Sequence, residues 1–227
     1  MLQLYIGNKN YSSWSMRPWV LLQQAGIPFE EILVRFDSFA SDSKFKATLK
    51  SVSPTGKVPA LVDGDLAVWD TLAIAEYLAE KFPDKHLWPA DAKARAIARS
   101  VSAEMHSGFT ALRTHCGMNI EANLAHIGEV IWRDHAAVRA DVQRLADMWG
   151  ALLDRSGGPM LFGEFTIADA FYAPVCSRIV TYALPVPEPI RAYIDRVMAL
   201  PGVTAWVQGA LAEQDFIAFD EPYRARR

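Results

Sequence analysis

Cysteine is scarce in this chain, since its 227 residues contain only Cys116 and Cys176. The two residues form no Cys-x-x-Cys pair, no metal-binding spacing and no disulfide framework. The histidines are equally scattered, so we expect no metal site. This pattern excludes dithiol exchange by the chain alone and is typical of a reducing compartment. We therefore expect a cytoplasmic protein.

Long apolar runs and an excess of one charge are also absent. No stretch approaches the ~18 consecutive apolar residues of a membrane span, and the N-terminus lacks the layout of a signal peptide. The 23 basic and 26 acidic residues give a net charge of −3, spread over both halves of the chain. Neither half has the basic surface that nucleic acid requires, so we expect no membrane or nucleic-acid partner.

The hydrophobic content of 51% is high enough to form a core, and the first eighty residues carry an alternating pattern. Asp63-Gly64-Asp65 between two apolar runs indicates a hairpin. Pro18 suits a helix only in its first turn. The predicted elements are strand 2–6, helix 15–25, strand 29–35, helix 42–51, strands 60–62 and 66–69, and helix 71–81. Their order, βαβαββα, predicts an α/β domain over residues 1–82.

Beyond a proline-containing linker at 83–89, the sequence shows helical spacing only. The predicted helices cover 92–116, 130–155, 167–184, 190–200 and 203–212. Thr166 and Asp169 have the spacing of a capping box in front of an apolar helix. We therefore predict an all-α domain over residues 90–227.

Three local motifs resemble those of the cytosolic glutathione transferase family. They are Ser12-Ser13-Trp14-Ser15-Met16-Arg17, Gly56-Lys57-Val58-Pro59-Ala60-Leu61 and the segment from Asp70 to Leu78. Gly163 to Asp169 also fits the folding motif of this family. The resemblance covers nearly the whole chain and implies a thioredoxin-like domain with a cis-proline at Pro59, followed by a helical domain. The serine-rich motif is nearest to the zeta, maleylacetoacetate isomerase-like branch, where it reads S-S-C-S-W-R.

The resemblance implies that glutathione is the co-substrate and that a serine hydroxyl stabilises its thiolate. Ser12 and Ser13 stand before a predicted helix, where a hydroxyl can donate to sulfur and the helix N-terminus favours negative charge. Serine is also a common helix cap, and we expect Ser15 to fill that structural role. The resemblance places the neighbouring Trp14 in the glutathione site.

Further glutathione-binding residues follow from the other two motifs. The resemblance implies that Val58, before cis-Pro59, pairs its backbone with the cysteinyl unit of glutathione. Asp70 and Thr71 open a helix, whose N-terminus can bind the γ-glutamyl carboxylate while Asp70 binds the ammonium. The resemblance adds Lys44 and Lys57 for the glycyl end. It also suggests Glu104, which would approach the glutathione of a partner subunit.

The second-substrate site is expected against the first helix of the all-α domain. Several of the expected residues share one face of the predicted helix 92–116. For the apolar ones, Met105 and Phe109, packing in the core is an equally good explanation. Tyr11 would lie at the mouth of the site, and Arg178 is a candidate carboxylate ligand. The expected residues are Tyr11, Met105, His106, Phe109, Thr110, Arg113 and Arg178.

The leading hypothesis is a detoxifying glutathione S-transferase that attacks a small electrophile with the glutathione thiolate. A maleylacetoacetate isomerase-type cis–trans isomerase is the runner-up, with Arg17, Arg113 and Arg178 available for substrate carboxylates. A glutathione-dependent disulfide reductase or peroxidase, and a low-activity glutathione-binding or regulatory protein, are further alternatives. The resemblance implies a homodimer.

Overall fold

The computed structural model describes residues 1–227, and its N-terminal part forms a four-stranded sheet. The strands are β1 (Leu2–Ile6), β2 (Phe29–Leu33), β3 (Ala60–Asp63) and β4 (Leu66–Trp69), in the spatial order β2-β1-β3-β4. β1 pairs in parallel with β2 and antiparallel with β3, and β3 and β4 form the predicted hairpin. With its three helices, this sheet confirms the predicted thioredoxin-like α/β domain.

These helices are α1 (Ser13–Gln24), α2 (Lys44–Leu49) and α3 (Thr71–Lys81). Pro18 lies inside α1, beyond its first turn, so the expectation for this proline was wrong. Proline has no N–H to donate to the carbonyl four residues earlier, which is that of Trp14. Thr71 Oγ1 donates to the Trp14 carbonyl instead, at 3.4 Å, and thereby links the start of α1 to the start of α3.

The rest of the chain is helical, as predicted. It contains α4 (Ala92–Ser107), α5 (Thr110–His115), α6 (Ala125–Asp134), α7 (Ala136–Ser156), α8 (Ile167–Thr181), α9 (Glu188–Met198) and α10 (Pro201–Glu213), with short 3-10 turns at Pro83–Lys85 and Ala218–Asp220. The capping box of Thr166 and Asp169 begins α8 as expected, with Thr166 N donating to Asp169 Oδ2 at 2.9 Å. None of the helices is long and apolar enough to cross a membrane.

The predicted helix 92–116 is two helices, and the prediction of one continuous helix was wrong. The chain turns at Gly108 and Phe109, where Phe109 has a φ of +54°. Asp141 Oδ2, from α7, accepts from the Leu112 amide at 2.9 Å and so caps the start of α5. This contact is tertiary, and it stabilises a break that local helical spacing does not reveal.

The predicted helix 130–155 was also wrong, because α6 ends at Asp134 and α7 begins at Ala136. Arg139 satisfies the carbonyls at the end of α6 by donating from Nη1 to the oxygens of Trp132 and Arg133. Gly128 allows α6 to approach the end of α8, since a Cβ there would lie 1.8 Å from the Tyr182 carbonyl oxygen. No glycine or proline marks this break in the sequence.

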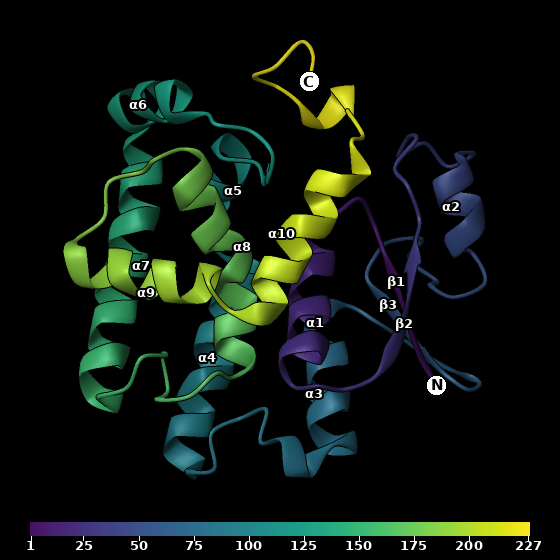
Figure 1. Ribbon diagram of the computed structural model, residues 1–227, viewed down its shortest axis with the longest axis horizontal. Coiled ribbons are helices and arrows are strands. Elements are labelled where there is room, and N and C mark those ends of the chain that lie inside the picture. The colour runs from purple at the N-terminus through teal and green to yellow at the C-terminus, as the bar shows by residue number, and fades with distance from the viewer.

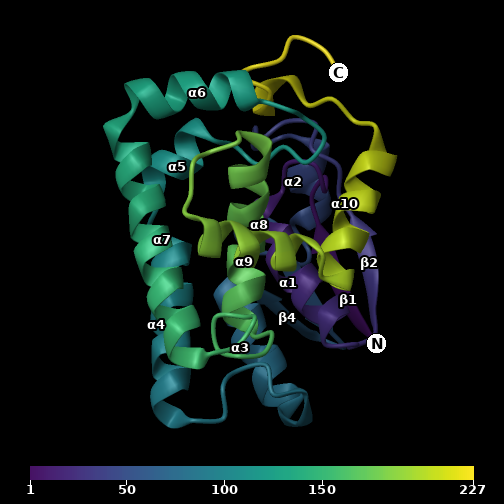
Figure 2. The ribbon, with the colours of Figure 1, turned by 60° about the vertical axis from the view of Figure 1, so that its left-hand side comes forward.

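Figures 1 and 2 show how the two parts meet. Helix α1 lies between the sheet and the helical domain and packs on α8 and α10. One continuous apolar core runs from Leu4 of the sheet to Trp149 in α7 and Trp206 in α10. The start of α1 is thereby held against both the sheet and the helical domain.

Candidate functional site

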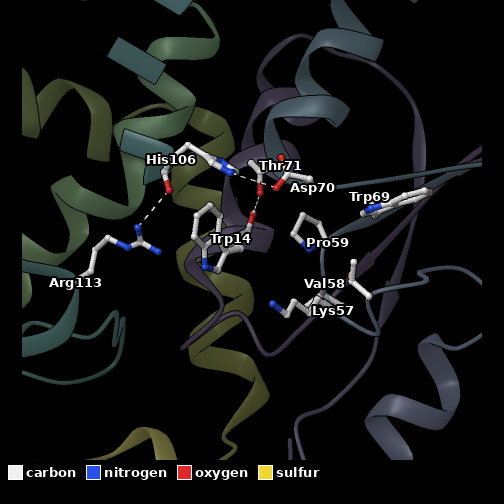
Figure 3. A pocket seen from close by; sticks show the side chains of 10 residues that line it. Trp14, Lys57, Val58, Pro59, Trp69, Asp70, Thr71, His106 and Arg113 are labelled. Atoms are coloured by element: carbon white, nitrogen blue, oxygen red, sulfur yellow. Dashed lines mark hydrogen bonds and ion pairs between the residues drawn. The ribbon is translucent and has the colours of Figure 1, made fainter. Parts of the chain in front are cut away.

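A groove of about 510 Å³ lies where the start of α1, the loop before β3 and the start of α3 meet. Helices α4 and α5 form its far wall, and Figure 3 shows the side chains around it. The lining residues are Trp14, Thr55, Lys57, Val58, Pro59, Trp69, Asp70, Thr71, His106 and Arg113. The groove therefore brings together residues of all three motifs from the α/β domain and two predicted residues from the helical domain.

Val58 lines this groove and has free backbone groups. The Val58–Pro59 peptide bond is cis, as the resemblance implied. The N–H and C=O of Val58 form no hydrogen bond within the chain, although the next residues enter β3. A free amide donor and acceptor on one half-buried residue can pair with the backbone of a peptide-like ligand, as an added strand would.

The start of α3 forms the polar end of the groove. Asp70 is the N-cap, with Oδ1 accepting from Leu72 N at 2.8 Å. Its φ of +76° is rare for a residue other than glycine and marks a strained backbone held by its surroundings. Thr71 is buried beside it, and its hydroxyl contacts Trp14 as described above. The helix N-terminus can bind a carboxylate, and the Asp70 carboxylate can bind an ammonium.

Trp14 lies beside this polar end and contacts the helical domain. The guanidinium carbons of Arg17 and Arg113 lie 4.4 Å and 4.8 Å from the centroid of its half-buried ring. The ring also contacts the edge of His106, whose Nε2 lies 3.4 Å from Asp70 Oδ2. The opposite nitrogen of His106 is buried and has no partner. Figure 3 shows Trp14 between Arg113 on one side and Pro59 on the other.

The two serines before α1 are in different surroundings. Ser12 is the N-cap of α1, and its hydroxyl donates to Ser15 Oγ at 2.7 Å. Ser15 is fully buried and also accepts from the amide of Gly7, so the expectation that Ser15 caps the helix was wrong. Ser13 Oγ accepts from Arg178 Nη2 at 3.1 Å, and its own proton has no acceptor in the chain.

Three arginines gather next to Ser13. Arg17 and Arg178 are buried and Arg113 is half-buried, yet none of them forms an ion pair with a carboxylate. Burial, together with the charges of Arg178 and Arg113, lowers the pKa of Arg17 to about 9, and burial lowers the pKa of Arg178 to about 10. Buried charges are normally paired, so three arginines without an ion pair are unusual, and the Asp70 carboxylate acts on Arg17 only from beyond ion-pair distance.

A cavity of about 370 Å³ opens onto this cluster and is lined by Ser13, Trp14, Thr110, Arg113, Thr114 and Arg178. No acidic residue lines it. Thr110, Arg113 and Arg178, three of the expected second-substrate residues, therefore lie together next to Ser13.

A further cavity, of about 400 Å³, lies on the other side of the serines. It is lined by Tyr11, Ser12, Ser13, Trp14, Phe36, Phe39, Phe45, Lys46, Lys57, Val58 and Asp220. Tyr11 Oη donates to Glu221 Oε1 at 2.7 Å and accepts from Ile217 N at 3.2 Å. Burial and the Glu221 carboxylate raise the pKa of Tyr11 to about 12, so this phenol stays protonated and bound to the C-terminal segment.

Several expected residues lie elsewhere. Lys44 is exposed at the start of α2 and lines none of these three cavities, whereas Lys57 lines two of them. Met105 and Phe109 are buried in the core, which matches the packing alternative for them. Glu104 forms a bidentate salt bridge with Arg144 of its own chain, with both hydrogen bonds at 2.8 Å.

Sequence reasoning missed several residues around these cavities. Lys46 lies two positions after Lys44, and its Nζ donates to the Gly56 carbonyl at 2.7 Å. Thr55 and Trp69 stand next to two of the family motifs, so position along the chain could have found them. No motif pointed to Phe39 or Asp220, because only the fold brings the loop before α2 and the C-terminal segment to the serines.

The fold and the groove together define a class of protein: a thioredoxin-like domain whose cis-proline loop lines a groove, joined to a helical domain that forms the opposite wall. Comparison with known proteins agrees. Residues 11–81 match the family model of the glutathione S-transferase N-terminal domain, and residues 121–209 match that of the C-terminal domain. The chain belongs to the glutathione S-transferase family.

Individual relatives support this membership. The chain is 31% identical to glutathione S-transferase Z1 of Arabidopsis thaliana over 180 residues, covering 73% of this chain and 74% of the relative. It is 29% identical to a probable maleylacetoacetate isomerase of Caenorhabditis elegans, covering 76% of each. A crystal structure of a glutathione transferase homologue from a Burkholderia strain, with bound glutathione, superposes with a TM-score of 0.68 at 29% identity, over 93% of this chain and 98% of that one.

Proposed function

We propose that this protein is a glutathione transferase that binds reduced glutathione in the 510 Å³ groove and ionises its thiol beside Ser12 and Ser13. The observation that carries the proposal is that Val58, whose N–H and C=O are free, lines a groove whose polar end is a strained helix N-terminus. Glutathione offers a peptide backbone in its middle and a carboxylate with an ammonium at one end. The order of these groups matches the order of the partners along the groove.

The assignment of each contact follows from this order. Val58 pairs with the cysteinyl unit, the start of α3 with Thr71 binds the γ-glutamyl carboxylate, and Asp70 binds the ammonium. Lys57, with Lys46 beside it, faces the glycyl carboxylate, and Trp14 covers the sulfur. The thiol then lies next to the serines. Lys44 and Glu104, which the resemblance suggested, lack a supporting contact and are not part of this proposal.

Thiol activation requires a modest free energy. A free thiol with a pKa of about 8.5 is only a few per cent ionised at neutral pH, and lowering the pKa by two requires about 2.7 kcal/mol. A hydroxyl donor and the positive end of α1 act in this direction, and the three arginines, which form no ion pair, add positive charge nearby. The serine acts as a donor and keeps its proton.

The test is a pH titration of the thiolate absorbance of enzyme-bound glutathione. We expect a pKa well below that of free glutathione, together with turnover of a small electrophile such as an activated aryl halide. Binding with an unchanged thiol pKa would contradict the transferase and favour a glutathione-binding or regulatory protein. Turnover confined to disulfides or hydroperoxides would favour the reductase or peroxidase alternative.

A second candidate function is favoured by the cavity of Arg113 and Arg178. An anionic electrophile such as a maleyl dicarboxylate would supply the carboxylate that these guanidinium groups lack. Arg113 has its Nε and Nη2 free, because only Nη1 is used, by the carbonyls of His106 and Gly108. Reversible addition of the thiolate to the double bond of such a substrate permits cis–trans isomerisation without consumption of glutathione.

Two experiments test the isomerase: conversion of a maleyl substrate, and removal of one positive charge from the cavity. We expect a maleyl substrate to be converted to its fumaryl isomer with catalytic glutathione. Arg113→Gln should raise KM for the dicarboxylate about tenfold and leave KM for an uncharged aryl halide unchanged. Equal effects on both substrates would contradict a carboxylate-binding role for this residue.

We also propose that two copies form a homodimer through β4 and α3. Leu66 and Trp69 are 45% and 43% exposed on the edge strand β4, beside an apolar groove formed with Leu72 and Ala73. Exposed apolar groups gathered on one edge are typical of an interface. Light scattering should give twice the chain mass, and Leu66→Glu should give the monomer. A monomeric wild-type protein would contradict the dimer.

A further inference from the structure

We propose that the 400 Å³ cavity beside Tyr11 selects an aromatic electrophile that carries a cationic group, such as a substituted ammonium, and that Asp220 is the residue that binds this cation. This inference rests on the proposed function and names a class of second substrate for it. The cavity of Arg113 and Arg178 lies on the other side of the serines and contains no acidic residue, so it has no such preference.

Three phenylalanine rings form the apolar wall of the 400 Å³ cavity. Phe36 and Phe45 are buried, and Phe39, from the loop before α2, meets both rings edge-to-face with centroids 5.3 and 5.9 Å away. Phe39 is 52% exposed and also contacts Phe219 of the C-terminal segment at 5.0 Å. Aromatic side chains that stay partly exposed around a cavity of this size are typical of a small-molecule site.

Asp220 adds an unpaired negative charge to this apolar wall. Four acidic residues lie between positions 213 and 221, and three of them, Glu213, Asp215 and Glu221, accept hydrogen bonds from other parts of the chain. The half-buried carboxylate of Asp220 has neither a hydrogen bond nor an ion pair. Burial, together with the Glu221 carboxylate, raises the pKa of Asp220. A cationic ligand would supply the partner that this carboxylate lacks.

The two lysines of the cavity have other partners. Lys46 Nζ donates to the Gly56 carbonyl at 2.7 Å and lies 5.7 Å from the centroid of the Phe45 ring. Lys57 also lines the glutathione groove, where the proposed function assigns it to the glycyl carboxylate. Neither lysine forms an ion pair with Asp220. With glutathione bound, its glycyl carboxylate offsets Lys57, and Asp220 still lacks a counter-charge.

An aromatic cation fits both features of the cavity. An aryl group packs on the phenylalanine rings, and a cation is attracted to their faces as well as to the carboxylate. A neutral hydrocarbon would leave Asp220 unpaired, and an anion would be repelled by it. The reacting carbon would then lie next to Ser12 and Ser13, which line the same cavity.

The cationic group takes no part in the reaction itself. When the electrophile is an aryl chloride, the thiolate sulfur forms a C–S bond, the C–Cl bond breaks, and chloride leaves with its electron pair. The reaction needs no other reactant. Asp220 is therefore expected to act on binding of the second substrate and not on the chemical step.

The binding experiment compares two S-benzylglutathiones that differ in charge. One carries a para trimethylammoniomethyl group and the other carries the isosteric, neutral neopentyl group, while reduced glutathione reports on the groove alone. In calorimetry we expect wild type to bind the cationic conjugate about tenfold more tightly than the neutral one. Asp220→Asn should lower affinity for the cationic conjugate about tenfold and change affinity for the neutral one less than twofold.

Turnover gives an independent measurement with chlorodinitrobenzenes that carry the same two substituents. Asp220→Asn should raise KM for the cationic electrophile about tenfold, leave its kcat unchanged, and leave both constants unchanged for the neutral electrophile. An equal change for the two electrophiles would overturn the role of the charge. A loss confined to kcat would also overturn it, because a residue that only binds the cation does not act on the chemical step.

Two further variants test the aromatic wall and the position of the charge. Phe39→Leu keeps an apolar side chain but removes the ring, so affinity for the cationic conjugate should fall about threefold and affinity for the neutral one less than twofold. Asp42→Asn is the matched control, because Asp42 is exposed in the same loop and does not line the cavity. This control should behave as wild type, and all variants should bind reduced glutathione as wild type does.

The outcomes separate this inference from the proposed function. A wild-type protein that does not bind reduced glutathione contradicts the proposed function, and the inference falls with it. A protein that binds glutathione but has equal affinity for the two benzyl conjugates overturns the inference and leaves the transferase intact. A preference for the cationic conjugate that survives in Asp220→Asn, or that is lost equally in Asp42→Asn, also overturns it, because the charge would then act from elsewhere.

Discussion

At the scale of single residues, Asp70 combines two roles that are usually separate. Its carboxylate caps α3 through the Leu72 amide, and it also faces the groove next to His106. Its φ of +76° and ψ of +133° lie outside the left-handed helical region and strain the backbone for aspartate and asparagine alike. Asparagine has the same size and can cap α3 in the same way, so a substitution here removes only the charge next to the groove.

Asp70→Asn should separate these roles. The amide oxygen of asparagine still caps α3, so stability should change by less than about 0.5 kcal/mol. Affinity for glutathione should fall about tenfold, because the ammonium loses a charged partner. Calorimetry with a des-amino analogue of glutathione is the control, since that analogue should bind wild type and variant equally. Equal losses for both ligands would contradict the ammonium contact.

Glu221 is the residue that fastens the C-terminal segment over the cavity of Tyr11. Burial acts to raise the pKa of the Glu221 carboxyl, but hydrogen bonds from Arg224, Tyr11 and Asn119 outweigh it and lower the pKa. A carboxyl whose pKa is lower in the folded state than in the unfolded chain stabilises the protein at pH values above the unfolded pKa. That contribution is lost as the pH falls through the lower, folded value.

Glu221→Gln should therefore cost stability in a pH-dependent way. At pH 7 we expect a loss of about 1–3 kcal/mol in the free energy of unfolding, because buried hydrogen bonds to a charged group are removed. The difference from wild type should shrink steadily below about pH 4, as wild type itself becomes protonated. Urea titrations at several pH values measure this, with exposed Glu129→Gln as control. A difference that does not depend on pH would refute the role of the charge.

At the scale of elements, glycines decide how closely the helices approach one another. Gly128 in α6 meets the Tyr182 carbonyl, whereas Gly150 in α7 has its nearest neighbour, Ile190 Cδ1, 4.0 Å from the position of a Cβ. Both residues lie inside helices, where glycine is unfavourable on conformational grounds. The same substitution should therefore have opposite effects at the two positions.

Gly128→Ala should lower the free energy of unfolding by about 3 kcal/mol, since the added methyl group forces α6 away from the Tyr182 carbonyl. Gly150→Ala should raise it by about 0.5–1 kcal/mol, since helix propensity improves and nothing is displaced. Chemical denaturation of both variants gives the comparison. If Gly128→Ala leaves the free energy of unfolding unchanged, α6 can move away from the Tyr182 carbonyl without cost. The close contact at Gly128 would then not be what holds the chain break at His135.

At the scale of the whole molecule, one continuous apolar core joins the two parts. Helix α1 is buried along most of its length because α8 and α10 cover the side that the sheet leaves open. Trp206 Nε1 donates to the Lys9 carbonyl at 3.0 Å, and the Glu213 side chain accepts from the Lys9 amide. These contacts attach the loop in front of the serines to α10.

Thermal unfolding of the full chain should be a single transition. Far-ultraviolet circular dichroism and tryptophan fluorescence should give the same midpoint, and glutathione should raise both midpoints together. The physical reason is that exposing α1 would also expose the faces of α8 and α10 that pack on it. Two separate midpoints, with only one of them sensitive to glutathione, would contradict this coupling.

The sequence by itself determined the α/β order, the hairpin, the capping box of Thr166 and Asp169, and the motifs around the serines, the cis-proline and Asp70. These features depend on local periodicity, on turn residues and on short motifs, which act within a few positions of the chain. The family resemblance that the motifs carry predicted one site for Val58, Asp70 and Thr71, and all three line one groove.

Only the tertiary structure decided the rest, because the deciding contacts join distant segments. Asp141 from α7 ends the long predicted helix at Phe109, and Arg178 from α8 separates Ser13 from Ser12. The C-terminal segment reaches Tyr11 through Glu221, a contact across most of the chain. Hydrogen bonds of this kind follow from packing, and neither periodicity nor local propensity carries any information about them.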